Sequence, residues 1–92
     1  MYILRIEHPV PDYAAWKAAF DSDPIGRERS GVRRYRILRA IDDPSHVMVD
    51  LESDSASEAE AVRAALDDPT SPPDVTHGLR VRIIEAVETK EY

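Results

Sequence analysis

Two histidines in this sequence have the side-chain chemistry and the positions to handle protons. His8 ends an alternating segment, and an imidazole titrates near neutral pH. The structural alternative is a strand-end histidine that hydrogen-bonds to backbone or water. His77 lies beside Gly78, whose backbone freedom can place the ring at a pocket mouth, with a solvent-exposed loop position as the alternative. His8 and His77 are therefore the candidate catalytic residues.

Four aromatic residues are candidates for holding a ligand. Tyr13, Trp16 and Phe20 recur at helical spacing, and Tyr35 follows in a later alternating segment. Such side chains can line an apolar pocket in which a hydroxyl or indole N–H orients the ligand. Core packing is the alternative, and both roles can hold together because an incompletely filled core can also be a ligand pocket. Tyr13, Trp16 and Tyr35 are accordingly the candidate ligand-binding residues for an apolar, aromatic small molecule.

Other chemistries find little support in the sequence. The three histidines are widely spaced, and the acidic pairs fall at turns and helix ends, so we expect no metal. The glycines are isolated, so no phosphate-binding loop is present, and we expect no cofactor. Arg33, Arg34, Arg36 and Arg39 make one segment basic, but alternation divides them between two faces. Because the net charge is −6 and no aromatic stacking pair accompanies them, we expect no nucleic-acid partner.

Hydrophobic patterning supplies the elements that must position these residues. Alternation predicts strands over 2–8, 32–41, 46–52 and 79–87, and helical spacing predicts helices over 12–20 and 55–66. Asp23-Pro24 predicts a further short helical segment that runs to Arg29 and stops at Gly31. Asp42-Asp43-Pro44-Ser45 predicts the turn of a hairpin. Ser55 and Glu58 form a candidate capping box.

This order of elements predicts an α+β fold in one domain over residues 1–92. A helix that links two strands crosses over in a right-handed sense, and each crossover here leaves room for one strand between. Two interleaved units give a four-stranded antiparallel sheet with both helices on one face. The aromatic residues of the first helix are expected to form a buried stripe on that face, and Ala59, Val62 and Leu66 of the second helix a narrower one. Strand parity also turns His8 toward the helices.

The other face of the sheet is expected to mix charged and apolar side chains. Its expected members are Ile3, Arg5, Glu7, Arg34, Arg36, Leu38, His46, Met48, Asp50, Glu52, Arg80, Arg82 and Ile84. Cross-strand Arg–carboxylate pairs tolerate partial burial because they form two parallel hydrogen bonds. A hydrated face remains the alternative, but we favour a homodimer in which two such faces meet.

The β-α-β-β-α-β order, carried by residues 2–8, 12–20 and 32–52, resembles the dimeric α+β barrel superfamily. That ferredoxin-like group includes antibiotic-biosynthesis-monooxygenase-like proteins. The resemblance implies a dimer, and some members oxidise or isomerise small aromatic molecules without a metal. Haem-degrading members use an Asn–Trp–His set, and quinone-forming members rely on Asn, Trp, Tyr and Arg. This chain has no Asn, so neither set is complete here.

Two functions follow from different classes. The first is a cofactor-independent monooxygenase or isomerase of an apolar, aromatic metabolite. The second is a non-catalytic dimeric protein that binds a small molecule or serves as an accessory protein. A pocket of ~300 Å³ or more with His8 exposed inside it favours the enzyme, and a solid aromatic core favours the binding protein. No apolar run approaches the ~18 residues of a membrane span, and no signal peptide is evident, so a cytoplasmic location is expected.

Overall fold

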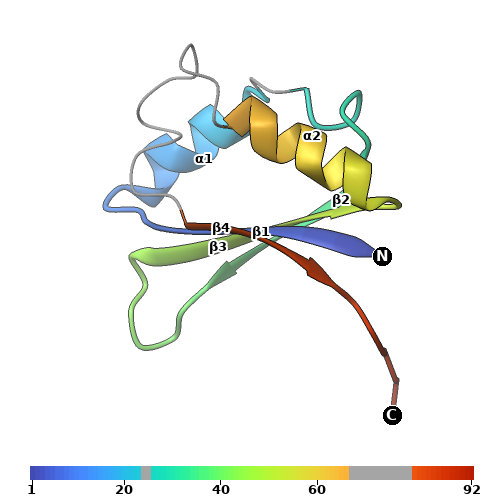
Figure 1. Ribbon diagram of the computed structural model, residues 1–92. Helices are drawn as coiled ribbons and strands as arrows, with labels where there is room; N and C mark the ends of the chain where they lie inside the picture. The colour runs from blue at the N-terminus through green and yellow to red at the C-terminus, as the bar shows by residue number, and fades with distance from the viewer. Residues whose placement is uncertain (24–25, 67–79) are drawn as a thin grey trace.

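The computed structural model describes residues 1–23, 26–66 and 80–92 (Figure 1). The elements are β1 (Tyr2–Pro9), α1 (Tyr13–Asp21), β2 (Val32–Arg39), β3 (His46–Ser53), α2 (Ala56–Leu66) and β4 (Arg80–Glu85). The predicted order of strands and longer helices is therefore confirmed. His77 and Leu79, which the sequence analysis placed in a loop and at a strand start, lie outside the described residues.

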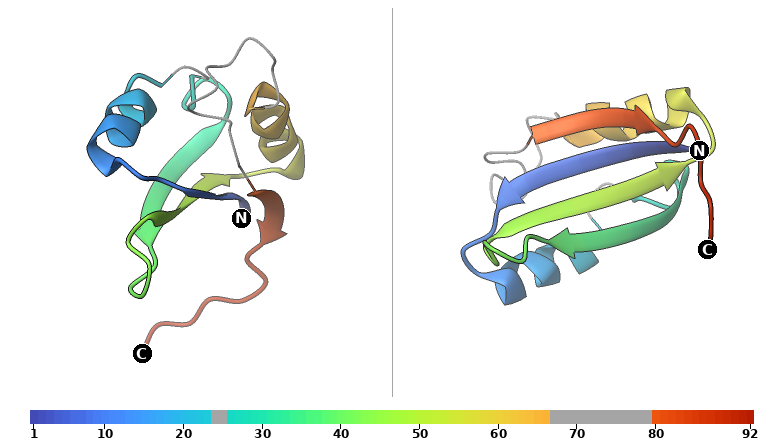
Figure 2. Two further views of the ribbon diagram at one scale, coloured as in Figure 1. Left: turned by 90° about the vertical axis from the view of Figure 1, so that its left-hand side faces the viewer. Right: turned by 90° about the horizontal axis from the view of Figure 1, so that it is seen from below.

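The strands form a single antiparallel sheet in the order β2-β3-β1-β4. Both helices lie on the same face of this sheet, as Figures 1 and 2 show. Each helix therefore carries the chain past one intervening strand, β3 for α1 and β1 for α2. The predicted βαββαβ α+β fold is confirmed.

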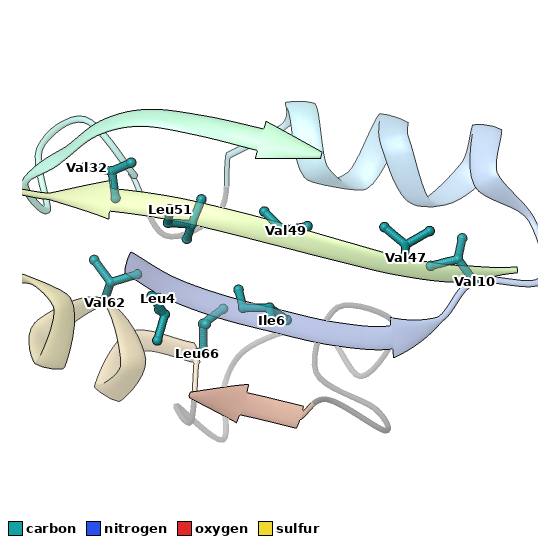
Figure 3. Close-up of a cluster of buried hydrophobic side chains, with 9 residues drawn as sticks. All are labelled: Leu4, Ile6, Val10, Val32, Val47, Val49, Leu51, Val62 and Leu66. Carbon is teal, nitrogen blue, oxygen red and sulfur yellow. The ribbon is translucent and has the colours of Figure 1, made fainter. Parts of the chain in front are cut away.

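Strand register decides which side chains face the helices. His8 pairs with Val47, Ile6 with Val49 and Leu4 with Leu51. These residues lie at the buried centre of the molecule, and Figure 3 draws the apolar ones among them. The full apolar cluster is Leu4, Ile6, Val10, Val32, Val47, Val49, Leu51, Val62 and Leu66. Since β-branched and Leu side chains dominate it, the core is aliphatic rather than aromatic.

The two helices contribute unequally to this core. In α2, Ala59, Val62 and Leu66 are buried, as the sequence predicted. In α1 no residue is buried. Trp16 and Phe20 pack partly against the cluster, and Tyr13 is exposed. The expectation that these aromatic side chains form a buried stripe is therefore wrong, because Trp16 and Phe20 are only partly covered where they pack against the aliphatic core.

The segment between α1 and β2 also differs from its prediction. Residues 27–31 form successive turns rather than a short helix, with Gly31 N–H donating to the Glu28 carbonyl at 3.2 Å. Gly31 has a φ of 101°, and a Cβ there would overlap the Glu58 carboxylate. Asp23 acts locally, since its carboxylate accepts the Arg27 N–H at 2.9 Å. A glycine is thus required where the chain enters β2.

The hairpin turn forms through the side chain that the sequence indicated. The Asp43 carboxylate accepts hydrogen bonds from the Ser45 N–H at 3.2 Å and the Ser45 hydroxyl at 2.6 Å. β2 ends at Arg39, two residues before the predicted limit, and Ile41 is 99% exposed. The predicted strand end at residue 41 is therefore wrong, because the turn begins before Ile41.

The start of α2 carries part of the predicted capping box. The Ser55 hydroxyl accepts the Glu58 N–H at 3.2 Å and donates to the Glu58 carboxylate at 3.0 Å. One free backbone donor of the first turn is thereby satisfied. Among the described residues, no helix is long and apolar enough to cross a membrane.

Candidate functional site

Helix α1 presents a continuous row of aromatic side chains that extends onto β2. The Asp12 carboxylate starts the helix by accepting the Ala15 N–H at 3.1 Å. Tyr13 and Trp16 ring centroids lie 5.7 Å apart, those of Trp16 and Phe20 5.2 Å, and those of Phe20 and Tyr35 5.0 Å. We call these four residues the aromatic row. The structure therefore brings together the three candidate ligand-binding residues Tyr13, Trp16 and Tyr35, with Phe20 between the last two.

The row remains accessible from solvent. Tyr13 is 38% exposed and Tyr35 44%, while Trp16 and Phe20 are half-buried. Trp16 and Phe20 are nearly parallel, with an angle of 29° between their planes. These half-exposed rings present flat apolar surface to water. Such a surface suits a planar apolar ligand, which would remove that area from water.

His8 lies beneath the middle of the aromatic row. Its ring centroid is 5.7 Å from that of Trp16, and the residue is only 4% exposed. Burial lowers the pKa of His8, a backbone hydrogen bond at Pro9 opposes this, and the charge of His46 lowers it further. Because the unperturbed value is near 6.5, the imidazole is neutral at pH 7 and can accept a proton. His8 thus faces the helices as predicted and lies beside Trp16, but it is not exposed in a pocket.

An arginine lies at each end of the aromatic row. The Arg27 guanidinium lies 3.9 Å from the Phe20 ring centroid and 5.2 Å from that of Tyr35. It also donates to the Phe20 carbonyl at 2.9 Å. At the other end, Arg39 lies 5.6 Å from the Tyr13 ring centroid. Both distances are within the range of cation–π attraction.

Arg27 is not indicated by any pattern in the sequence. It follows Gly26 in a turn without periodicity, so no spacing links it to Phe20. The structure shows its guanidinium over the rings of Phe20 and Tyr35, which face each other across α1 and β2. Arg39 was noted as basic, yet its side chain lies on the helix-facing side with Val47 and His8 in the paired rows of the sheet.

A cleft of about 370 Å³ opens beside the Tyr35 end of the row. Its lining residues are Asp23, Arg27, Glu28, Val32, Arg33, Arg34 and Tyr35. The volume lies in the range of small-molecule sites, which run from ~300 Å³ upward. However, His8 does not line this cleft. Two conditions would favour an enzyme, a large pocket and a His8 exposed inside it. Among the described residues, the volume of this cleft meets the first condition, and the second is not met.

The face of the sheet away from the helices, here called the reverse face, has a polar centre. Arg5, Asp50 and Arg36 lie side by side on β1, β3 and β2. Arg5 Nε and Nη2 donate to the two Asp50 oxygens at 2.7 and 2.8 Å, and Arg36 adds a third hydrogen bond at 2.9 Å. The Arg5 hydrogen bond is the main cause that lowers the pKa of Asp50. The Asp50 side chain is 1% exposed, so it is a buried anion on an outer surface.

Apolar residues flank this ion pair on the same face. Ile3 and Ile84 are opposite each other on β1 and β4, and Leu38 and Met48 are opposite on β2 and β3. All four are half-buried within this chain. His46 Nε2 lies 3.4 Å from the Glu7 carboxylate near the hairpin end. The predicted mixed face is therefore present, and cross-strand ion pairs join Arg5 and Arg36 to Asp50 and Arg34 to Glu52.

Acidic and histidine side chains do not gather as a metal site in residues 1–23, 26–66 and 80–92. His8 and His46 lie on opposite faces of the sheet, and His77 is outside the described residues. The chemistry available to the described site is therefore aromatic binding, cation–π contact and proton transfer by one neutral imidazole.

Comparison with known proteins identifies the fold class. No family model and no curated protein sequence matches this chain. Among solved structures, the chain resembles SnoaB, a cofactor-independent oxygenase from Streptomyces nogalater, at a TM-score of 0.67 and 17% identity over 96% of this chain and 93% of SnoaB. It resembles a dimeric ferredoxin-like protein from an uncultured marine organism at 0.61 and 12% over 99% and 97%. An antibiotic biosynthesis monooxygenase matches at 0.55 and 16% over 96% and 100%.

These matches run over nearly the whole of each chain, at identities that establish the fold alone. The chain therefore has the ferredoxin-like fold of the dimeric α+β barrel proteins, as the element order predicted. It is the fold shared by antibiotic biosynthesis monooxygenases and at least one cofactor-independent oxygenase.

Proposed function

We propose that this protein is a homodimer that binds a planar aromatic metabolite on the aromatic row and oxidises or isomerises it without a bound cofactor. One observation carries the proposal. The half-exposed rings of α1 stack above a buried, neutral His8. The likeness to a cofactor-independent oxygenase supports the same class of reaction.

Binding is assigned to Trp16, Phe20 and Tyr35. A flat ligand that packs along these rings replaces water on three aromatic faces, which is favourable in proportion to the apolar area covered. Arg27 and Arg39 stand at the two ends of the row. They favour ligands whose polar, electron-rich groups lie at the periphery of the ring system, as in phenols and aromatic ketones.

His8 is assigned as the general base. A neutral imidazole can take a proton from a phenol or from a carbon next to a carbonyl, once a ligand displaces Trp16 enough to reach it. The imidazolium can return that proton to another carbon of the resulting anion, which is an isomerisation. Alternatively the anion transfers one electron to dioxygen, and the two radicals combine to a carbon-bound peroxide that takes the proton from the imidazolium. Where that carbon also carries a hydrogen, loss of water from the hydroperoxide leaves a new carbonyl. His77 is a second candidate for proton transfer at this site.

Dimerisation through the reverse face is part of the proposal. The Arg5–Asp50–Arg36 cluster and the half-buried Ile3, Ile84, Leu38 and Met48 are suited to partial burial by a second copy. A structural neighbour is described as dimeric. A two-fold axis across this face would leave both aromatic rows on the outside of the paired sheets.

A non-catalytic binding protein is the second candidate. It is favoured by the 4% exposure of His8 and by the absence of Asn, which the resembling oxidative enzymes use. In this case the aromatic row and the cleft would hold a ligand without changing it.

One set of measurements tests both candidates. Trp16 is the only tryptophan, so its fluorescence reports ligands at the row directly. We would titrate hydroxynaphthalenes and anthrones, and follow dioxygen uptake and product by mass spectrometry. The enzyme predicts quenching together with turnover that falls at least ~10²-fold in His8→Gln and persists in His46→Gln, a matched variant on the other face.

The outcomes separate the two classes. Quenching without turnover in the intact protein would exclude the enzyme and leave the binding protein. No quenching by any planar aromatic compound would contradict both. The oligomeric state is tested independently, since a monomer in sedimentation at micromolar concentration would refute the homodimer.

A further inference from the structure

The cleft at the Tyr35 end of the aromatic row is lined mostly by charged side chains. Among the described residues, Val32 and Tyr35 are its uncharged members, and the charged ones are Asp23, Arg27, Glu28, Arg33 and Arg34. Sites for the apolar part of a ligand are lined mainly by hydrophobic and aromatic side chains. The aromatic row provides that kind of surface, and the cleft does not. The cleft is therefore suited to a charged substituent of the ligand rather than to its rings.

Two residues belong both to the aromatic row or its end and to the cleft. The Tyr35 ring is the last of the row and also lines the cleft. The Arg27 guanidinium lies 3.9 Å from the Phe20 ring centroid and lines the cleft as well. A ligand whose rings cover Phe20 and Tyr35 thus has the cleft beside it, and a short side chain on those rings extends into the cleft.

Arg27 is the cation best placed to bind an anion there. Its side chain is 14% exposed, so water screens its charge less than that of the exposed Arg33 and Arg34. Its Nη1 donates to the Phe20 carbonyl, and its Nε lies 3.6 Å from the Asp23 carboxylate, beyond hydrogen-bond distance. Since a guanidinium has five N–H donors, Arg27 can bind a further acceptor and keep these contacts.

Arg33 and Arg34 on β2 add further donors to the cleft. Arg33 Nε donates to Asp54 and Arg34 Nε to Glu52, and both of these carboxylates lie outside the lining. The two hydrogen bonds leave the terminal nitrogens of each guanidinium for another acceptor. Because both arginine side chains are exposed, each is expected to stabilise a bound anion less than Arg27 does.

The two carboxylates of the lining do not offset these donors equally. Asp23 accepts the Arg27 backbone N–H at 2.9 Å and lies beside the Arg27 guanidinium, so it helps to hold Arg27 in place. Glu28 is exposed, and the repulsion between a hydrated carboxylate and a bound anion is screened by water and salt. The cleft therefore offers more N–H donors than free acceptor oxygens, which favours an anionic substituent over a cationic one.

We propose that the ligand of the aromatic row is an aromatic acid, and that the cleft binds its carboxylate through Arg27, with Arg33 and Arg34 as secondary donors. This inference rests on the ligand site proposed above. A carboxylate presents two oxygens in one plane, which match the planar fork of a guanidinium and allow two parallel hydrogen bonds. Arg27 is then the residue that selects acids over neutral aromatic compounds with the same rings.

A cycle of two ligands and two proteins tests the assignment. Calorimetry on the full chain would compare 2-naphthylacetate and the longer 2-naphthylpropanoate, each beside its primary amide, which has a similar shape and no charge. We expect at least one acid to bind the wild-type protein ~10-fold more tightly than its amide, and Arg27→Gln to bind the pair within ~2-fold of each other. Arg63→Gln, the same change at an exposed position of α2, should keep the wild-type preference.

The ratio of the two affinities separates the carboxylate from the packing of Arg27 on the rings. Loss of the cation–π contacts in Arg27→Gln weakens the acid and the amide together, so it leaves their ratio unchanged. Glu28→Gln removes a repelling charge and should strengthen binding of the acid alone. A measurement without any variant covers the case in which Arg27→Gln does not fold: the preference of the wild-type protein for the acid should shrink as salt is raised, while the affinity for the amide stays constant.

The results distinguish the failure of each proposal. Equal affinities of the wild-type protein for acids and amides would overturn the carboxylate site and leave the aromatic row as a ligand site. Tighter binding of 2-naphthylethylamine than of either acid would overturn it too, because the carboxylates of the cleft would then dominate. A preference for acids that persists unchanged in Arg27→Gln would refute the role of Arg27. If neither the acids, the amides nor the hydroxynaphthalenes bind, the ligand site itself is refuted.

Discussion

Helices α1 and α2 lie on the same face of one sheet but are used differently. α2 has the weaker apolar content, yet it buries Ala59 and Val62 completely and Leu66 to 6% exposure. α1 carries a Trp and a Phe, yet none of its residues is fully buried. The helix with the larger hydrophobic side chains is thus the one that stays in contact with water.

The contrast indicates a division of labour between the helices. Small and branched side chains on α2 pack on the face of the sheet and complete the aliphatic core. The rings of Trp16 and Phe20 on α1 pack only partly against that core, and they also pack with one another and with Arg27. Stability is therefore expected to depend mainly on α2, and ligand binding mainly on α1.

The largest stability effect is expected in α2. Leu66→Ala removes a buried side chain from the centre of the core, and such changes cost ~2–5 kcal/mol. We expect the free energy of unfolding to fall by ~3 kcal/mol, measured in urea at one fixed protein concentration because the proposed dimer would make stability depend on concentration. A loss below ~1 kcal/mol would show that α2 is packed no more tightly than α1.

A smaller effect is expected in α1 from a larger truncation. Phe20→Ala deletes a ring that would cost ~3–5 kcal/mol in a closed core. Because Phe20 is only half-buried, we expect ~1–2 kcal/mol in the same urea assay, together with at least ~10-fold weaker binding of planar aromatics. If instead the cost reached that of Leu66→Ala, α1 would be part of the core and the contrast between the helices would fail.

The same contrast explains which features the sequence could predict. Ala59, Val62 and Leu66 were assigned correctly because a narrow apolar stripe has one use, burial against a sheet. Tyr13, Trp16 and Phe20 have the same periodicity, but periodicity reports only which side of a helix faces the sheet. Periodicity does not report how closely a helix approaches the sheet, so it could not predict that the α1 side chains would stay half-exposed.

The site shows a similar limit. His8 was placed toward the helices by strand parity alone, and its contact with Trp16 follows from that. Arg27 depends on the path of residues 26–31, which is set by the positive φ of Gly31 and by Asp23, and no residue pattern encodes the distance to Phe20. Roles for His77 stay a prediction, since that residue lies outside the described part of the chain.

Arg27 tests whether the aromatic row depends on its terminal cation. Arg27→Ala removes the donor to the Phe20 carbonyl and the cation over two rings, with an expected cost of about 1 kcal/mol in stability. Arg29→Ala, an exposed neighbour, should stay within about 0.5 kcal/mol. Equal effects of the two variants would remove Arg27 from the site and leave the row held by α1 alone.

The smallest effect is a pH dependence from His8, which lies beneath α1. Burial lowers the pKa of His8, so its unfolded form, with a value near 6.5, takes up a proton before the folded form does. The stability due to neutral His8 is complete above about pH 6.5 and declines as the pH falls toward the folded pKa. Below that value it no longer changes.

The urea midpoint measured between pH 7.5 and 5 checks this sign. His8→Gln should remove the part of the decline that begins near pH 6.5, while His46→Gln should retain most of it. A bound aromatic ligand should steepen the decline if it buries the imidazole further. This result would show that His8 is part of the ligand site on α1. A wild-type profile that coincides with that of His8→Gln would mean that the ring is solvated, and that α1 covers the sheet even less closely than its half-exposed rings indicate.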